Sequence, residues 1–344
     1  MQWSLKINGK RYNNQNLADI NDSEIRNFLE EWGNDLPTIS VRTSGSTGTP
    51  KLISLLKTDM IASAELTGEY FNLQKGQSAL LCLPVKYIAG KMMVIRAIVS
   101  QLDLISVTPS SNPLITCESK INFAAMTPMQ VKMVLNKNPE KLDLINQLII
   151  GGALVNNVLK ARLQNVKSDC YSTYGMTETI THIAIKKLNK KNKSDTFKAL
   201  PNVTFELNNN DCLVVNTPHL QTSTVTTNDV ALLVDSQRFK WLGRFDNTIN
   251  SGGIKLQPES LEFKIIILTK EKRFFFSSLP DEVLGEKLIL VIESKGVIPN
   301  FEARLSELLD PFEMPKTIYY MDSFIETENG KVNRKETVLQ AYNL

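Results

Sequence analysis

One short loop combines the residue types that bind phosphate groups. It consists of Thr43, Ser44, Gly45, Ser46, Thr47, Gly48, Thr49, Pro50 and Lys51. Glycines let backbone N–H groups turn toward a ligand, while the hydroxyls and the ammonium add further donors. The spacing is not that of a Walker A loop. Taken by itself, the segment is equally well explained as a solvated turn.

Two further segments bear groups that suit a nucleotide. Gly151, Gly152 and Ala153 follow the apolar run 148–150, which leaves bare backbone at the end of a strand, where a flat ligand can approach. Residues 174–178 read Tyr-Gly-Met-Thr-Glu, and so offer a ring for a base, a hydroxyl for phosphate and a carboxylate for Mg²⁺. The alternatives are a core tyrosine and a carboxylate at a helix start.

A fourth group of residues lies in the last third of the chain. Asp229 has the carboxylate to accept two ribose hydroxyls, and the segment from Trp241 to Glu262 carries several further polar residues. Its alternative is a polar linker followed by a turn and a capped helix. Residues 329–335, Asn-Gly-Lys-Val-Asn-Arg-Lys, are by themselves a basic tail.

The elements that must position these residues alternate between strands and helices. Short apolar runs, expected as strands, lie at 39–41, 79–84, 102–107, 123–126 and 147–150, with amphipathic or apolar helical patterns around 23–33, 60–66 and 92–99. This alternation predicts an α/β fold with a largely parallel sheet. Two hairpins are expected at 3–13 and 203–215, and the hundred or so residues beyond Arg244 are expected to form a small α+β domain.

Composition restricts the class of protein. The chain has 344 residues and a formal net charge of +3, so no strong electrostatic attraction to nucleic acids or membranes is expected. The four cysteines are scattered, no apolar run is long enough for a membrane span, and the first residues lack the apolar core of a signal peptide. These features predict a cytoplasmic protein. With two histidines in the chain, a histidine-rich metal site is poorly supported.

Together, the phosphate-type loop, the Gly-Gly-Ala segment, the Tyr-Gly-Met-Thr-Glu segment and the C-terminal residues resemble the adenylate-forming superfamily of acyl-CoA synthetases and adenylation domains. They occur in that superfamily's order and over residues 39–335. The tail Gly-Lys-Val-Asn-Arg-Lys is most similar to that of the o-succinylbenzoate–CoA ligases of menaquinone biosynthesis. The resemblance implies a large domain over residues 1–245 that binds ATP and the acid, and a small mobile domain over residues 246–344.

The resemblance also implies roles for individual residues. ATP would contact Thr43, Ser44, Gly45, Ser46, Thr47, Gly48, Lys51, Gly152, Ala153, Tyr174, Gly175, Met176, Asp229 and Arg244. The catalytic residues would be Lys331 and Thr177, the Mg²⁺ ligand Glu178, the hinge Asp246, and the CoA channel Gly252 and Gly253. The implied reaction joins a small carboxylic acid to CoA through an acyl-adenylate, with ATP, Mg²⁺ and CoA required. No general base is needed, because the attacking carboxylate is already ionised.

The chain departs from the family's pattern in two places. It has 42 residues before the phosphate-type loop, where the family has well over a hundred, and we expect this difference to remove a dimer surface or part of the acid pocket. A homodimer therefore stays an open alternative. At the expected acid pocket, Tyr87 and Ala89 replace a His and a Ser, and Lys86, Lys91 and Arg96 bring three cations close together. Such cations would suit an acid with two carboxylates; the alternative is that they face water.

Three functions remain open at this point. The first is an ATP-dependent acid–CoA ligase, with o-succinylbenzoate as the expected acid. The second is an adenylation enzyme that loads a carrier protein, and the third is a degenerate nucleotide-binding protein without ligase activity.

Overall fold

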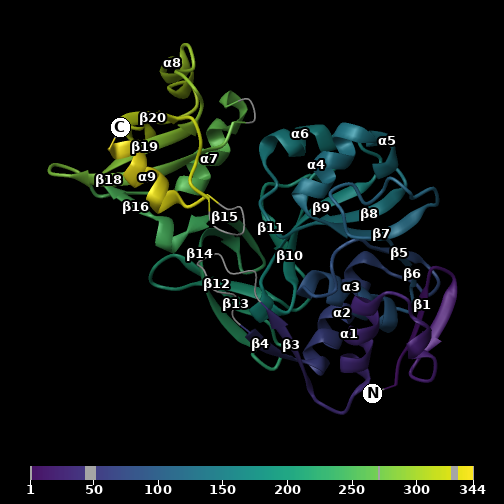
Figure 1. Cartoon of the computed structure of the whole chain (residues 1–344). Coiled ribbons are helices and arrows are strands. Elements are labelled where there is room, and N and C mark those ends of the chain that lie inside the picture. Colours follow the sequence, from purple (N-terminus) through teal and green to yellow (C-terminus); the bar gives the residue numbers. More distant parts are fainter. Residues whose placement is uncertain (1, 43–51, 270–271, 327–331, 344) are drawn as a thin grey trace.

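The fold is built around a large mixed sheet and a smaller sheet nearer the C-terminus, which lie in separate lobes (Figure 1). The computed structural model describes residues 2–42, 52–269, 272–326 and 332–343. Short 3-10 helices connect several elements within the described residues: η1 (Leu17–Asp19), η2 (Thr177–Thr179), η3 (Phe245–Asn247), η4 (Ile266–Leu268) and η5 (Pro311–Glu313).

The strands of the large sheet follow the order β12-β13-β14-β15-β11-β10-β9-β8-β7-β5-β6-β1-β2. Their bounds are β1 (Ser4–Ile7), β2 (Lys10–Asn13), β5 (Ser78–Leu81), β6 (Asp103–Ser106), β7 (Ile121–Met126), β8 (Ile145–Ile150), β9 (Asp169–Gly175), β10 (His182–Lys187), β11 (Phe197–Ala199), β12 (Thr204–Leu207), β13 (Cys212–Asn216), β14 (Thr224–Asp235) and β15 (Arg238–Arg244). Strands β1, β6, β5, β7, β8 and β9 pair in parallel, and the strands beyond β9 pair antiparallel. The predicted α/β fold is therefore confirmed, with an antiparallel extension.

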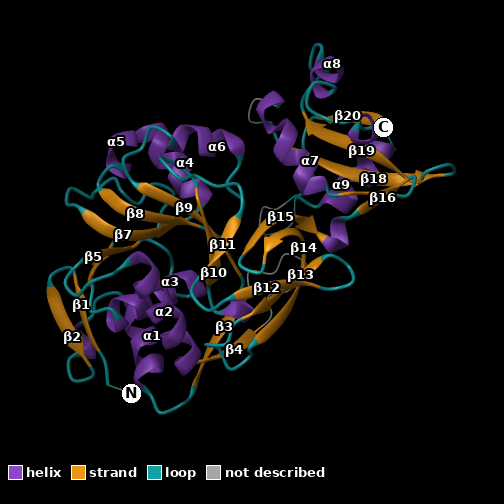
Figure 2. Cartoon of the chain, turned by 180° about the vertical axis from the view of Figure 1, so that it is seen from behind, coloured by secondary structure: helices purple, strands orange, loops and turns teal. Residues whose placement is uncertain are grey.

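Helices cover both faces of the parallel strands (Figure 2). On one face lie α1 (Ser23–Gly33), α2 (Lys57–Phe71) and α3 (Ile88–Val99), and on the other lie α4 (Pro128–Lys137), α5 (Pro139–Leu142) and α6 (Asn157–Leu163). Successive side chains of a strand point to opposite faces. Ala79 and Leu81 accordingly pack with the first group of helices, while Leu80 packs with the second. This double burial explains the continuous apolar runs in the sequence.

Several predicted local elements are present. The hairpins at 3–13 and 203–215 correspond to β1–β2 and β12–β13. Helix α1 begins after Asp22, whose carboxylate accepts the backbone N–H of Ile25 at 3.1 Å, and ends at Gly33 as expected. Strand β3 (Thr38–Arg42) was predicted, but its antiparallel partner β4 (Leu52–Leu56) was not. The predicted phosphate-type loop, residues 43–51, joins these two strands and lies outside the described residues.

The smaller sheet follows directly after β15. Its strands are β16 (Ile249–Ser251), β17 (Ile254–Leu256), β18 (Phe274–Asp281), β19 (Gly285–Glu293) and β20 (Thr317–Met321). Helices α7 (Pro258–Ile265) and α8 (Phe301–Leu305) share one apolar cluster with this sheet, and α9 (Arg334–Tyr342) packs with β18 and β20 in another. The small lobe thus has a core of its own.

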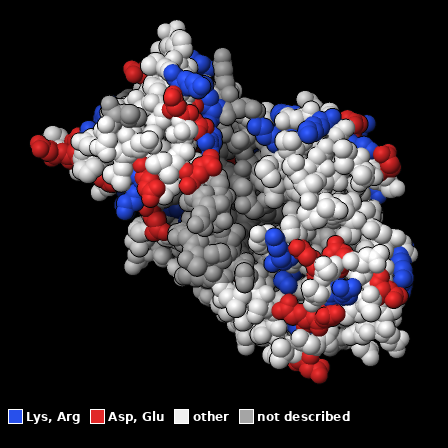
Figure 3. Space-filling model, viewed as in Figure 1, with Lys and Arg blue, Asp and Glu red and all other residues white. Residues whose placement is uncertain are grey.

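The distribution of charged side chains and the state of the cysteines agree with what the composition predicts. Basic and acidic side chains are interspersed over both lobes on the face shown in Figure 3. All four cysteines are free and buried. Among the described residues, none of the helices has the length and apolar character required to span a bilayer.

Candidate active site

A pocket of about 730 Å³ opens at the carboxyl ends of β5, β7, β8 and β9. Chain segments that leave these strands supply much of its wall, including residues 83–84, 151–154 and 174–177. The connection from β5 runs to β6 on one side, whereas the connection from β7, its other neighbour, runs to β8 in the opposite direction along the sheet. Open α/β sheets bind ligands at such a switch point, beyond the carboxyl ends of the strands.

One wall of the pocket carries the glycine-rich segments predicted to contact the nucleotide. Gly152 and Ala153, just after β8, line the pocket, and Gly152 has a φ of +81°, which favours glycine. Gly175, at the end of β9, also lines it; a Cβ there would come within 2.1 Å of the carbonyl oxygen of Thr181. Close backbone approach therefore requires glycine at Gly175.

Tyr174 belongs to the same wall, and a network of hydrogen bonds holds it in place. Its hydroxyl donates to one carboxylate oxygen of Asp229 at 2.8 Å, while Trp241 Nε1 and Arg244 Nη1 lie 3.1 and 3.4 Å from the other. The ring packs edge-on against Phe239. Burial, and then the neighbouring Asp229 carboxylate, raise the pKa of Tyr174. Tyr174 is therefore a neutral, fixed aromatic surface at the pocket.

Asp229 and Arg244, both predicted ribose ligands, are brought together by the β14–β15 register. Asp229 is 6% exposed and neither residue lines the pocket, whereas Tyr174 and Trp241 do. Each carboxylate oxygen has about two lone-pair positions. Among the described residues, the oxygen facing Tyr174 accepts from that hydroxyl alone, which leaves one position from which Asp229 can accept a further hydroxyl. Trp241 was not predicted as a site residue; its place next to Asp229 depends on the β-strand pairing.

A strained turn closes the pocket beside η2. Met176 and Thr177 line the pocket, and Glu178 is exposed. Ile180 follows with φ +64° and ψ −64°, and the backbone N–H of Thr181 donates to the carbonyl of Thr179 at 2.7 Å. This is a γ-turn centred on a β-branched residue, a conformation that costs on the order of 1–3 kcal/mol. Its effect is to place Thr181 and His182 on the pocket wall.

The opposite side of the pocket contains a buried cation. Arg96 of α3 lines the pocket and is 2% exposed. Its Nη2 donates to Thr181 Oγ1 at 3.1 Å and its Nε to Thr67 Oγ1 at 3.4 Å. No carboxylate pairs with it among the residues that the structure describes. Burial lowers the pKa of Arg96 to about 10, so it stays charged at neutral pH.

The other predicted acid-binding residues are distributed differently. Tyr87 lines the pocket and is 45% exposed, and the Lys86 ammonium lies 5.2 Å from the centre of its ring. The Lys91 ammonium lies 3.3 Å from a carboxylate oxygen of Glu31 and 4.3 Å from the centre of the Phe28 ring. Of the three predicted cations, Arg96 is the one found among the described residues that line the pocket.

The remaining predicted residues lie away from the pocket or outside the described part of the chain. Asp246, in η3, accepts a hydrogen bond from the Asn228 amide, and η3 lies between the last strand of the large sheet and the first of the small one. Gly252 and Gly253 form the turn between β16 and β17, with φ of +59° and +83°. Lys331, like residues 43–51, lies outside the described residues.

A mixed sheet with a pocket at its switch point, lined by glycine-rich backbone and a fixed tyrosine, is the architecture of a nucleotide-binding enzyme. Comparison with known protein families identifies the family of the enzyme. The chain belongs to the family of AMP-binding enzymes, which matches residues 16–225. It is an adenylate-forming enzyme of the AMP-forming acyl-CoA ligase type.

Individual relatives support the same assignment. The chain is similar to an AMP-forming acyl-CoA synthetase/AMP-acid ligase II-like protein from Dyadobacter fermentans, at 31% identity over 99% of this chain and 100% of that one, with a TM-score of 0.65. It is 25% identical to a 2-succinylbenzoate–CoA ligase from Lactococcus lactis, over 87% of this chain and 70% of that protein. The o-succinylbenzoate coenzyme A synthetase of Bacillus subtilis, solved with ATP and magnesium ion, shares the fold at 17% identity, covering 87% of this chain and 69% of that one, with a TM-score of 0.74.

Proposed function

We propose that this protein is an ATP-dependent acid–CoA ligase that works through an acyl-adenylate, releasing first pyrophosphate and then AMP. The observation that carries the proposal is the buried guanidinium of Arg96, which has hydroxyl partners but no described carboxylate partner at the pocket. An unpaired buried charge is costly and is typically kept for a ligand. A carboxylate in the pocket would supply the missing anion. Family membership supplies the nucleotide half of the reaction.

The pocket divides into two parts under this proposal. Adenine lies against Tyr174 and the Gly152–Ala153 backbone, with Asp229 and Arg244 toward the ribose. The acid occupies the side formed by Tyr87 and Arg96. Both groups of residues line or adjoin one continuous pocket, so an acid and a nucleotide can meet in it without crossing a wall. Thr177, on the rim between the two parts, is the proposed contact for the α-phosphate.

The residues near Thr177 fit a magnesium ion. No group of three or more potential ligands occurs among the described residues, which argues against a dedicated cage of side chains there. Mg²⁺ usually keeps several waters and takes one or two carboxylates together with substrate phosphates. Glu178, exposed and adjacent to Thr177, meets that requirement. A bound Mg²⁺ supplies charge neutralisation of the phosphates.

The proposed chemistry needs no protein base. The acid is ionised at neutral pH and attacks the α-phosphorus directly, with pyrophosphate as the leaving group. We propose that Lys331 bridges the acid and the α-phosphate in this step, and that residues 246–344 then rotate about Asp246. The turn at Gly252 and Gly253 would then face the CoA thiol, which displaces AMP. A rotation of this kind lets one pocket serve both half-reactions.

The proposed acid carries a second carboxylate. o-Succinylbenzoate has two, and it is the substrate in the names of several relatives, which suggests a role in menaquinone biosynthesis. A carrier protein in place of CoA is the second candidate. It is favoured by a 3,4-dihydroxybenzoate–[aryl-carrier protein] ligase from Bacillus anthracis, 21% identical over 92% of this chain.

Pyrophosphate release over a panel of carboxylic acids tests the proposal. Acid-dependent release that requires ATP and Mg²⁺ is the expected result, followed by thioester formation when CoA is added. Thioester formation on an aryl-carrier protein but not on CoA would select the second candidate. ATP binding without release for any acid would show a nucleotide-binding protein instead.

A further inference from the structure

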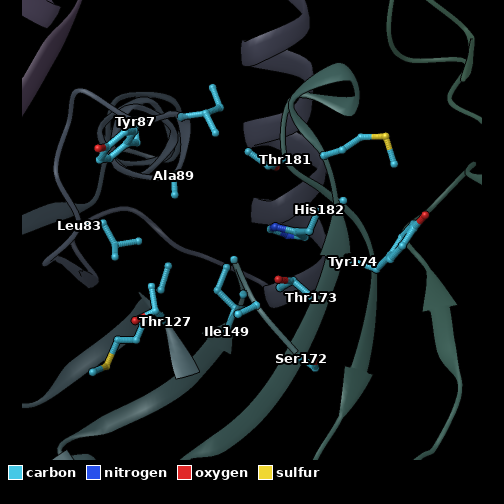
Figure 4. A pocket seen from close by; sticks show the side chains of 18 of the residues that line it. Leu83, Tyr87, Ala89, Thr127, Ile149, Ser172, Thr173, Tyr174, Thr181 and His182 are labelled. Carbon is cyan, nitrogen blue, oxygen red and sulfur yellow. The ribbon is translucent and has the colours of Figure 1, made fainter. Parts of the chain in front are cut away.

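A second polar group at the acid side of the pocket was not recognised from the sequence. His182, the first residue of β10, lines the pocket and is 6% exposed. In Figure 4 its ring lies between the labelled Thr181 and Thr173 on the pocket wall. Burial, and then the nearby Arg96, lower the pKa of His182 well below its ordinary value. The imidazole is therefore neutral, and one of its two nitrogens carries no proton.

The hydrogen bonds around Thr67 decide which nitrogen that is. The Thr67 hydroxyl lies 3.0 Å from the carbonyl oxygen of Ser63, to which it donates its single proton. It accepts from Arg96 Nε at 3.4 Å, and His182 Nε2 is 3.4 Å from the same oxygen. A hydroxyl has one proton and two lone pairs, so Nε2 must be a donor here. This assigns the proton to Nε2 and leaves a bare lone pair on Nδ1.

Nδ1 of His182 is available to a ligand. It forms no hydrogen bond with any of the described residues, and it is not among their fully enclosed, unpartnered polar atoms. It therefore keeps contact with the open pocket, close to Arg96. At this part of the wall the Arg96 guanidinium and His182 Nε2 are donors, whereas Nδ1 is an acceptor with no hydrogen-bond partner among the described residues.

We infer that His182 is a specificity-determining residue that accepts a hydrogen bond from a hydroxyl or amide N–H on the acid substrate. The inference rests on the proposed ligase function and narrows its substrate class. Arg96 selects an acid with a second anionic or acceptor group. His182 adds the requirement that the acid also carries a hydrogen-bond donor. o-Succinylbenzoate presents carboxylates and a ketone, all acceptors at neutral pH. An acid that also carries a hydroxyl group is thus expected to be the better substrate.

Pairs of acids that differ by one hydroxyl test this inference. The probes are succinate and malate, glutarate and 3-hydroxyglutarate, and benzoate with its three monohydroxy isomers, with o-succinylbenzoate included. For at least one pair, kcat/KM for pyrophosphate release should favour the hydroxylated acid by about ten- to a hundredfold, the range expected for leaving one buried acceptor unpaired.

Two substitutions at one position separate specificity from structure. In His182→Gln the amide nitrogen can still donate toward Thr67, but no acceptor remains near Nδ1, so the ratio of kcat/KM values should fall to about one. In His182→Asn the amide oxygen lies near the former Nδ1 position, so part of the preference should remain. His219→Gln is the matched control, since His219 does not line the pocket. A purely structural role would lower kcat/KM for both acids of a pair and leave their ratio unchanged.

The inference and the ligase function fail in different ways. Pyrophosphate release without a hydroxyl preference in any pair, or a preference that survives in His182→Gln, overturns the role of His182 while the ligase stands. If no acid releases pyrophosphate, the ligase function fails. The same acid pairs are then compared by the rise in Tm that they cause, and a rise that does not depend on the hydroxyl overturns the inference independently.

Discussion

Replacing Arg96 by methionine should move stability and activity in opposite directions. Burial lowers the pKa of Arg96 from 12.5 to about 10, which corresponds to about 3 kcal/mol of unfavourable free energy for the charged form at neutral pH. Arg96→Met removes that cost. It also removes two hydrogen bonds to Thr67 and Thr181, each contributing about 1 kcal/mol. The free energy of unfolding should therefore rise by about 1 kcal/mol in the protein without substrate.

The same substitution should impair recognition of a diacid. Loss of one partner from a buried charge pair costs about 2–5 kcal/mol, or roughly thirty- to several thousandfold in kcat/KM. The loss should be specific for the second carboxylate. o-Succinylbenzoate is therefore compared with 4-oxo-4-phenylbutanoate, which lacks the ring carboxylate. The substitution should lower kcat/KM for 4-oxo-4-phenylbutanoate much less than for o-succinylbenzoate.

Urea unfolding and pyrophosphate release on the same preparations measure both effects. Lys91→Met is the matched control, because Lys91 is also a buried cation of α3 but pairs with Glu31 away from the pocket. Lys91→Met should lower the free energy of unfolding, and its ratio of kcat/KM values for the two acids should be no smaller than that of the wild-type protein. If Arg96→Met is destabilised and loses activity equally with both acids, Arg96 is a structural residue and the reasoning is wrong.

Three other predictions concern the metal, the small lobe and pH. Glu178→Gln should keep the fold and weaken the Mg²⁺ dependence of turnover, measured by titrating MgCl₂; an unchanged dependence would exclude Glu178 from the metal site. Lys331→Ala should slow formation of the acyl-adenylate by about a hundred- to a thousandfold, yet leave thioester formation from a supplied acyl-adenylate nearly intact in single-turnover assays. Equal losses in both half-reactions would contradict a two-pose mechanism. Burial outweighs the Arg334 pair and raises the pKa of Glu262 to about 7, so its contribution to stability is present below about pH 4.5 and is lost as pH rises through 7. Glu262→Gln should flatten the curve of unfolding free energy against pH between about pH 4.5 and 7. If the wild-type protein instead gains stability relative to Glu262→Gln over this interval, the direction assigned to the pKa shift is wrong.

Local patterns predict much of the fold. The N-terminal hairpin depends on Asn8 and Gly9, both of which adopt positive φ, and α1 begins at an Asp22 cap. The parallel strands are recognisable because burial on both faces requires continuous apolar runs. Strand β4 was missed because it directly follows a glycine-rich loop and has no turn signal of its own before α2.

The convergence of the residues predicted to contact the nucleotide was also accessible from the sequence. Gly152, Tyr174 and Thr177 lie at or just after the carboxyl ends of strands that share one edge of the sheet, so their convergence depends mainly on strand order. Lys91 and Arg96 show the limit of such reasoning. They are five residues apart on a helix, which places them about 140° apart around its axis. Which of the two faces the pocket depends on how α3 packs, and packing turns Lys91 toward Glu31.

The sequence by itself therefore determined the fold class and the family, and it predicted which residues line the glycine-rich wall of the pocket, because these depend on short-range patterns and on the order of segments along the chain. Tertiary structure alone decided which of the predicted cations lines the pocket and which side chains surround it. Arg96, Thr67 and His182 come from α3, α2 and β10, and they meet only because the sheet and its helices pack together. The turn at Ile180 that presents His182 is a conformation no β-branched residue favours locally, so the surrounding fold must impose it.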